Sequence, residues 1–250
     1  MTLGRALWKS ALVALGITVV IFFTYTHNWI ALVGFYLVTF VLIVTLVEFW
    51  RAARARQKTQ QENFFTALYR LMGRNRRRYG GYVIHVSMML MAIGILGINL
   101  FQQQTQGTLA IGQSVKIAGY TIQYKDLASW DETAKGVNYT RAVISVYKDG
   151  QYLQDLYPRK DYYYDAQQTM TIPGLRPTLQ DDLYIILVDW QPASDIGATF
   201  KIYVNPLVNW LWIGSLLFML GIFIAAWPDQ DPEAITVRAA QTSHQTSAAD

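Results

Sequence analysis

A run of 38 residues from Ser10 to Val47 contains no charged side chain, and this run constrains the fold more than any other feature. A spanning helix needs roughly 20 apolar residues, so the run predicts two spans joined by a hairpin at residues 24–28. A signal peptide is the alternative for the first segment, but no small-residue cleavage site follows and a second apolar segment comes at once. Two later apolar segments, residues 82–101 and 206–227, predict a third and a fourth span.

The charged residues are few and unevenly placed. They make up 15% of the chain, whereas soluble domains carry about 25%. The formal net charge of +4 does not indicate a nucleic-acid partner, because the basic residues cluster between apolar segments instead of covering a folded face. The sequence has no cysteine, which excludes disulfides, thiolate metal sites and cysteine nucleophiles.

The basic residues also predict the orientation of the chain. Between Arg51 and Arg78 there are nine Lys or Arg residues and one acid, Glu62. Short loops rich in Lys and Arg stay in the cytoplasm. We therefore expect the start of the 1–50 hairpin, the basic loop 51–81 and the tail 228–250 to be cytoplasmic. The tail is rich in Ser, Thr, Gln and Ala, which predicts disorder.

The basic loop contains a predicted surface helix. Apolar residues recur there at helical spacing, with Arg70 and Arg74 on the opposite side; the apolar positions are Phe64, Phe65, Leu68, Leu71 and Met72. The run Arg76–Arg78 has two interpretations. It is either a topology determinant beside anionic lipid headgroups, or a functional contact with a partner loop or an anionic cofactor group.

The segment 102–205 has the pattern of β structure and is expected on the outer side. Runs rich in β-branched and aromatic residues predict strands, at 114–117, 121–127, 139–147, 152–157, 183–190 and 199–204. Asp149-Gly150 between two of these runs predicts a hairpin. The fold class is therefore a membrane protein, α-helical with about four transmembrane helices, plus an all-β extracytoplasmic domain of the sandwich or open-barrel kind.

No catalytic residue is identified in the outer segment, which has no nucleophile elbow, HEXXH motif or phosphate-binding glycine loop. The pair Asp181-Asp182 is a candidate cation site, but adjacent strand residues point to opposite faces, which favours a structural role. The cluster Tyr162–Tyr164 is interpreted as packing or a binding surface.

Of the three histidines, His85 is the strongest candidate for chemistry. His244 lies in the polar tail and His27 lies in the predicted outer hairpin. His85 falls near the start of the third span and is followed by an apolar run. An ionisable residue inside a span indicates function by default, and a neutral imidazole is a normal axial ligand of haem iron. The alternative is a hydrogen bond to a backbone carbonyl near the inner interface.

Four segments resemble one known family. They occur in the family's order and cover roughly residues 30–227: RRRYGGYVIH at 76–85, LYPRKDYY at 156–163, TLQDDLYIIL at 178–187 and NPLVNWLWIG at 205–214. In these segments the chain resembles the C-terminal part of the CcmF-type cytochrome c biogenesis proteins, which are haem lyases.

The resemblance implies a bacterial-type plasma membrane protein that helps attach haem to apocytochrome c on the outer face. In the family a transmembrane haem b, interpreted as an electron relay, is held by two histidines from different helices, and His85 matches the later one. The matched motifs also suggest eight supporting residues: Arg77, Arg78, Gly80, Gly81, Pro158, Asp182, Tyr184 and Trp212. Implied partners are apocytochrome c, haem-delivery and apocytochrome-handling assembly proteins, and membrane lipids, with no nucleic acid.

The family's tryptophan-rich haem motif, the two external histidines beside it and the earlier haem ligand are missing from this sequence. The chain is therefore expected to be a split subunit, which Met1 before a span favours, or a fragment. On either interpretation it is part of a haem lyase complex, incomplete without a partner that carries the tryptophan-rich half. Two other classes remain open: a membrane-anchored ligand-binding or scaffold subunit of a transport or electron-transfer complex without haem chemistry, and an electron-transfer subunit unrelated to cytochrome assembly.

Overall fold

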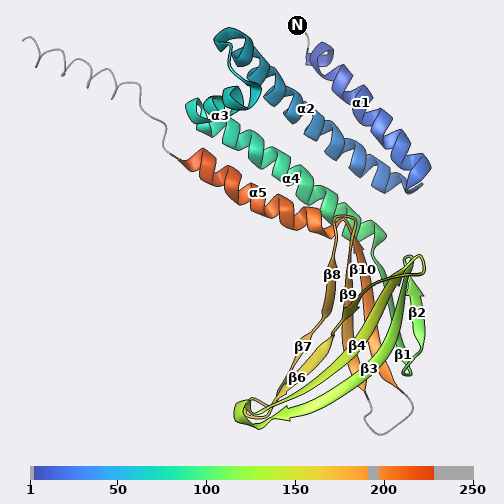
Figure 1. The fold of residues 1–250 in the computed structure, drawn as a ribbon. Helices are drawn as coiled ribbons and strands as arrows, with labels where there is room; N and C mark the ends of the chain where they lie inside the picture. The colour runs from blue at the N-terminus through green and yellow to red at the C-terminus, as the bar shows by residue number, and fades with distance from the viewer. Residues whose placement is uncertain (1–2, 191–196, 228–250) are drawn as a thin grey trace, which may run out of the picture. The chain divides into compact units, whose positions relative to one another are not determined.

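The computed structural model describes residues 3–190 and 197–227 (Figure 1). The chain divides into two compact units. One comprises Met1–Ala92 together with Ile213–Asp250, and the other is Ile93–Trp212. The predicted tail 228–250, with His244, lies outside the described residues.

Four helices in the described part are long and apolar enough to cross a membrane. They are α1 (Leu3–Thr24), α2 (Trp29–Gln60), α4 (Arg76–Phe101) and α5 (Val208–Ala226). The α1–α2 hairpin is fixed by Asn28, whose side-chain oxygen accepts a hydrogen bond from the Ile30 N–H at 3.0 Å and so caps α2. The helical part of the predicted fold class is confirmed.

Two of these helices extend into the basic segment. The helix α2 continues to Gln60, beyond the predicted hairpin boundary at residue 50, and α4 begins at Arg76, ahead of the predicted span at 82–101. Ala, Arg, Gln and Lys are good helix formers, so both helices continue past their apolar runs. Between them lies α3 (Phe64–Arg74), where the apolar periodicity predicts a surface helix.

Glu62 joins α2 to α3. Its carboxylate pairs with Arg56 of α2 at 3.5 Å and with Arg70 of α3. The Glu62 side chain is only 13% exposed. The one acid of the basic segment therefore fastens the turn between the two helices.

Small residues bring α4 and α5 into close contact within the helical unit. A methyl group added at Gly80 would lie 2.7 Å from the backbone nitrogen of Ala225. A methyl group at Gly214 would lie 2.8 Å from the Ser87 carbonyl oxygen. Close backbone approach through small residues is the usual way that spanning helices associate.

The second unit contains two antiparallel sheets (Figure 1). One has the order β1-β10-β9-β8, with the strands Gln103–Leu109, Ala198–Pro206, Asp181–Trp190 and Gly174–Pro177. The other has the order β2-β3-β4-β6-β7, with the strands Ser114–Ile117, Tyr120–Glu132, Val137–Lys148, Arg159–Tyr163 and Gln168–Ile172. The strand β5 (Gln151–Leu156) also pairs with β4. The predicted β domain is confirmed as a sandwich.

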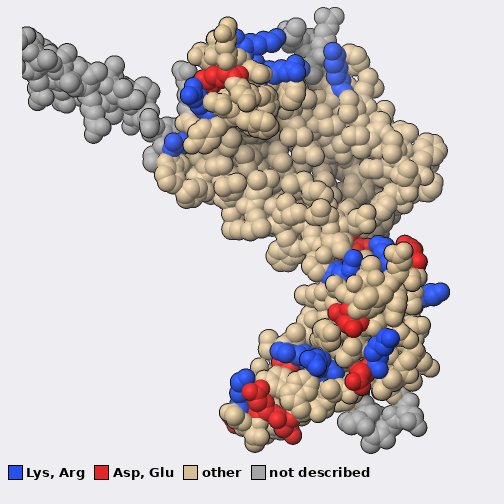
Figure 2. Space-filling model, in the orientation of Figure 1, with Lys and Arg blue, Asp and Glu red and all other residues tan. Residues whose placement is uncertain are grey.

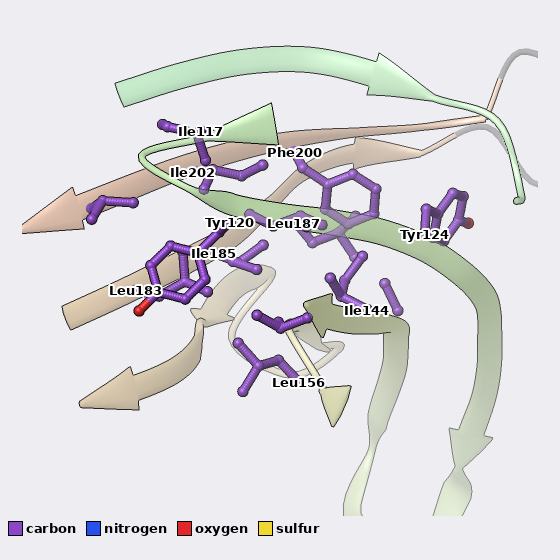
Figure 3. Packing of buried hydrophobic residues seen from close by; sticks show 14 of the residues in the cluster. Ile117, Tyr120, Tyr124, Ile144, Leu156, Leu183, Ile185, Leu187, Phe200 and Ile202 are labelled. Atoms are coloured by element: carbon purple, nitrogen blue, oxygen red, sulfur yellow. The ribbon is translucent and has the colours of Figure 1, made fainter. Parts of the chain in front are cut away.

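The two sheets enclose one apolar core (Figure 3). Alternate residues of each strand point inward, as the two-residue period of a strand requires. The strands β3 and β4 contribute Tyr124 and Ile144, while β9 and β10 contribute Ile185 and Phe200. The rings of Tyr124 and Phe200 meet edge to face, with centroids 5.1 Å apart. Burial of each such side chain contributes roughly 1.5–3 kcal/mol, so this core holds the second unit together.

Pro158 separates β5 from β6, which pair with the two halves of β4. Proline has no N–H to donate, but the Pro158 carbonyl accepts a hydrogen bond from the Ala142 N–H at 2.9 Å, between the two paired stretches. The predicted turn at Asp149-Gly150 joins β4 to β5, with φ angles of 51° and 80°. Positive φ at both positions is the geometry of a two-residue hairpin turn.

Candidate functional site

His85 lies nine residues after the first residue of α4, roughly 14 Å along the helix axis at 1.5 Å per residue. Its side chain is exposed. Within residues 3–190 and 197–227, the His85 imidazole has no hydrogen bond, ion pair or ring contact. The alternative interpretation, a hydrogen bond to a backbone carbonyl, finds no partner in the described part of the chain.

His85 belongs to an open face of α4. Arg78, His85 and Met88 are exposed and are spaced by seven and three residues, which places them on one side of the helix. Gly81 lies on the same side, one turn before His85. In the part of the chain that the structure describes, a methyl group added there would meet no atom within 4 Å beyond its chain neighbours and its own helix backbone. The helix packs on α5 through other residues, such as Gly80.

The start of α4 is held against α2 by aromatic contacts. The ring of Phe49 on α2 contacts those of Tyr79 and Tyr82, with centroids 5.8 Å and 5.3 Å away, and the two tyrosine rings lie 5.8 Å from each other. Arg78 donates a hydrogen bond from Nε to the Tyr82 hydroxyl at 3.2 Å. Arg77 is exposed. The aromatic contacts turn the side of α4 that carries Tyr79 and Tyr82 toward α2.

The residues around His85 fit one axial haem contact. A neutral imidazole on a rigid helix can present a ring nitrogen to iron, and the absence of a side chain at Gly81 leaves room beside it. The other histidine in the described part of the helical unit is His27. It lies in the hairpin at the far end of α2 from the basic segment, with its ring 4.7 Å from that of Phe22. The described residues also hold no cluster of metal-binding side chains.

The remaining predicted residues lie in the second unit. Asp182 is half-buried, and burial together with the charge of Asp181 raises the pKa of its carboxyl above the usual value. Tyr184 packs edge-on against Tyr203 of the neighbouring strand, with centroids 6.1 Å apart. Trp212, on α5, is 63% exposed. Asp182 and Tyr184 thus lie partly buried within the sandwich, whereas Trp212 is exposed.

Asp181 lies in a polar cluster that joins four strands. Its Oδ1 accepts a hydrogen bond from the Tyr120 hydroxyl at 2.7 Å, and its other oxygen lies 3.6 Å from the Lys148 ammonium. Arg176 donates to the same Tyr120 hydroxyl at 3.2 Å. Burial and the bond to Asp181 raise the pKa of Tyr120, so it acts as a neutral donor. The Asp181 carboxylate therefore supports the sandwich, in keeping with the structural role that its place on a strand favours.

The loop between β8 and β9 holds the beginning of α5. Three successive carbonyls of residues 178–180 each accept a hydrogen bond from this region. The donors are the Leu207 N–H at 2.9 Å, the Asn209 side-chain amide at 2.6 Å and the Trp210 indole N–H at 3.1 Å. Two of the segments that carry the family resemblance thus meet in the folded chain.

A stack of arginine and aromatic side chains lies on one face of the sheet formed by β3, β4 and β6. The Arg141 guanidinium lies over the rings of Trp130 and Tyr157, at 5.3 Å and 5.5 Å. Arg159 lies over the Tyr139 ring at 5.5 Å. Sequence reasoning missed this stack, because its members, at positions 130–159, come together only through the pairing of β3, β4 and β6. We call these five residues the arginine–aromatic stack.

Residues 100–206 match the family model described as the CcmF C-terminal beta-sandwich. The chain resembles the C-terminal region of CcmF-type proteins. It is 28% identical over 201 residues to the cytochrome c-type biogenesis protein CcmF of Pseudomonas aeruginosa, covering 80% of this chain and 28% of that protein. It is 31% identical over 147 residues to the probable cytochrome c-type biogenesis protein NrfE of Escherichia coli, covering 58% of this chain and 26% of that protein.

About a third of a solved CcmF structure has the same fold as most of this chain. The structure of "Cytochrome c Heme Lyase CcmF" aligns with a TM-score of 0.66 and 18% identity, covering 88% of this chain and 34% of that one. The chain therefore spans about a quarter to a third of the length of these relatives. It is a multi-pass membrane protein that resembles the CcmF-type cytochrome c biogenesis proteins.

Proposed function

We propose that this chain is the C-terminal part of a cytochrome c haem lyase and helps attach haem to apocytochrome c. The match of residues 100–206 and the relatives that extend the likeness over 80% of the chain support this assignment. The chain covers about a third or less of those relatives. The function accordingly requires a partner half that carries the tryptophan-rich haem-handling motif, either as a separate subunit or as the rest of a longer protein.

Within that complex, His85 supplies one axial ligand to a transmembrane haem b. The observation that carries this proposal is the open face of α4, where the exposed His85 has no hydrogen bond, ion pair or ring contact within the described residues and Gly81 leaves space one turn earlier. The second ligand comes from the partner half. When bound, this haem supplies one-electron transfer that keeps the delivered haem iron reduced. The contacts of Phe49 with the start of α4 fix its orientation, so that His85 faces the partner.

The basic end of the helical unit faces the cytoplasm, because the positive-inside rule places the Arg51–Arg78 segment there. The hairpin at residues 25–28 and the sandwich then lie outside the plasma membrane. Apocytochrome c and the proteins that deliver haem and apocytochrome meet the chain on that outer side. Two surfaces of the sandwich are available to these partners. They are the arginine–aromatic stack and the exposed strand β7, which lies at the edge of its sheet.

The test is the absorption spectrum of the chain purified in complex with its partner half, for the wild type and for His85→Ala. We expect a reduced b-type haem signal that the substitution abolishes, together with loss of cytochrome c maturation. Met88→Ala is the matched control, because Met88 is exposed on the same face three residues away. It should retain the signal.

Two outcomes would contradict the proposal. A haem signal that survives His85→Ala in an intact complex removes His85 as a ligand. Normal cytochrome c maturation without this chain instead favours the alternative class, a membrane-anchored scaffold or ligand-binding subunit.

A further inference from the structure

A second site lies at the basic end of the helical unit and is independent of the proposed function. A pocket of about 680 Å³ is bordered there by α2, α3, α4 and the end of α5. Sites for small molecules are typically roughly 300–1,000 Å³. Figure 2 shows charged side chains of the helical unit gathered at this end, while the rest of that unit's visible face is largely uncharged.

Three arginines from three helices line this pocket: Arg56, Arg70 and Arg76. Glu62 pairs with the first two, so these four side chains carry three positive charges and one negative. A guanidinium has five N–H donors, so an arginine that already has a contact within the chain retains donors for a ligand. Guanidinium groups bind phosphate oxygens with strong, charge-assisted hydrogen bonds. The charge of the pocket therefore selects an anion, and the planar donors suit a phosphodiester.

The other wall of the pocket is apolar. Phe223, Ile224 and Trp227 line it from the end of α5 onward, and the Arg76 guanidinium lies 5.9 Å from the centre of the Trp227 ring. Tryptophan is typical of the headgroup level of a bilayer. A free inorganic anion would gain nothing from this wall, whereas a ligand with an anionic head and an apolar body would contact both sides.

A separate apolar groove of about 550 Å³ adjoins the pocket, and Met72 lines both. The groove includes Val86 of α4 and Leu217 of α5. Val86 follows Arg76 by ten residues, which corresponds to roughly 15 Å along the helix. The groove therefore runs from the level of the arginines toward the middle of the spans, as an acyl chain does below its headgroup.

We propose that the pocket and groove together bind one anionic phospholipid. The phosphodiester contacts Arg56 and Arg76, and one acyl chain lies in the apolar groove. The bound lipid fills the space between α3 and the adjoining ends of α4 and α5. It thereby holds the basic segment against the other helices. Basic pockets between spanning helices on the cytoplasmic side suit anionic headgroups.

Native mass spectrometry of the detergent-purified full chain tests this site. Phosphatidylglycerol is titrated beside phosphatidylcholine with the same acyl chains. We expect the first phosphatidylglycerol to bind roughly tenfold more tightly, since one charge-assisted contact is worth about that factor. Arg76→Gln should bind phosphatidylglycerol more weakly than the wild type by roughly the same factor. Lys58→Gln is the matched control, because it removes one positive charge at an exposed position of α2 outside the pocket.

A second variant separates binding from folding. Gly73 lines the pocket, and among the described residues a methyl group added there would meet no atom within 4 Å beyond its chain neighbours and its own helix backbone. The leucine side chain of Gly73→Leu therefore enters the pocket without an immediate clash. Leucine also has a higher helix propensity than glycine. We expect weaker phosphatidylglycerol binding from a variant whose thermal stability in detergent, without added lipid, is equal or higher.

Three results would overturn the proposal. Equal binding of the two lipids removes the role of charge. An equal loss of phosphatidylglycerol affinity in Arg76→Gln and Lys58→Gln would mean that the lipid is attracted by the general surface charge and not by the pocket. Full displacement of phosphatidylglycerol by equimolar glycerol phosphate, which has no acyl chain, would mean that the site binds an anion and that the groove contributes no affinity. All three readouts are independent of haem and of cytochrome maturation.

Discussion

Gly81 and His85 lie one helical turn apart on the open face of α4. Among the described residues, a methyl group at Gly81 would have no atom within 4 Å apart from its chain neighbours and the backbone of its own helix. Its neighbour Gly80 has the opposite environment, because a methyl group there would press on the Ala225 backbone at 2.7 Å. Two adjacent glycines thus have different reasons to lack a side chain. Gly80 permits helix packing, and Gly81 keeps the approach to His85 open.

The first prediction compares leucine at these two positions. Gly81→Leu should leave the thermal stability of the purified chain unchanged or raised, because the side chain enters open space and favours the helix. It should nevertheless reduce the b-type haem signal of the complex with the partner half. Gly80→Leu should destabilise the chain by roughly 1–3 kcal/mol, the usual cost of overpacking. Full haem binding by Gly81→Leu would show that the macrocycle does not pass over this position.

The helices were predictable from the sequence because an uncharged run has few alternatives to a membrane span. Their ends were not, since α2 continues through the basic segment to Gln60 and α4 begins within it at Arg76. Each of the six predicted strand segments falls on an observed strand in the described part of the chain, although the segment 152–157 extends one residue past the end of β5. The strands β1, β6, β7 and β8 were missed, because they are polar or short and lack a clear alternation. Backbone pairing with neighbouring strands, and not local propensity, makes them strands.

The candidate site was predictable to the same partial extent. His85 stands out as the one histidine within a spanning run, and this needs no tertiary information. The open space at Gly81 depends on which sides of α4 its neighbours cover. The arginine–aromatic stack depends on paired strands that bring Trp130, Arg141 and Tyr157 together. The spacing of residues in the sequence predicts neither the open space at Gly81 nor the arginine–aromatic stack.

The second prediction concerns the hydrogen bonds that hold the beginning of α5. Trp210→Phe removes the indole N–H that donates to the Leu179 carbonyl at 3.1 Å. We expect the free energy of unfolding to fall by about 1 kcal/mol, the net value of one hydrogen bond. Trp212→Phe is the matched control, since Trp212 is 63% exposed on the same helix. Thermal unfolding of the purified chain measures both, and equal shifts would mean that the indole bond contributes nothing.

The third prediction is a pH dependence at Asp182. Burial and the adjacent Asp181 charge raise its folded-state pKa above the ordinary value of 3.8. The folded state therefore holds the proton more tightly than the unfolded state. The penalty for ionising the buried carboxyl is absent below the unfolded pKa and fully present above the folded pKa. Stability should fall as the pH rises through that interval.

Asp182→Asn should consequently stabilise the chain at neutral pH, with a benefit that disappears toward pH values below about 4. Asp181→Asn provides the contrast, because it weakens the contacts to Tyr120 and Lys148 and should destabilise the sandwich at neutral pH. Unfolding measured across the pH range checks both. An Asp182→Asn effect that does not change with pH would assign it to packing and not to charge.

The last prediction places apocytochrome c at the exposed edge strand β7. This strand ends its sheet, and its pairing partner β6 carries Arg159 of the arginine–aromatic stack directly opposite Ile172. An extended peptide added to β7 would gain backbone hydrogen bonds from the edge and side-chain contacts beside the stack. A photo-cross-linking residue at Thr169 should capture apocytochrome c in the assembled complex. The same residue at Gln106, exposed on the edge strand β1 of the other sheet, should capture much less. Equal capture at both edges, or none at Thr169 in a complex that matures cytochrome c, would exclude β7 as the binding edge.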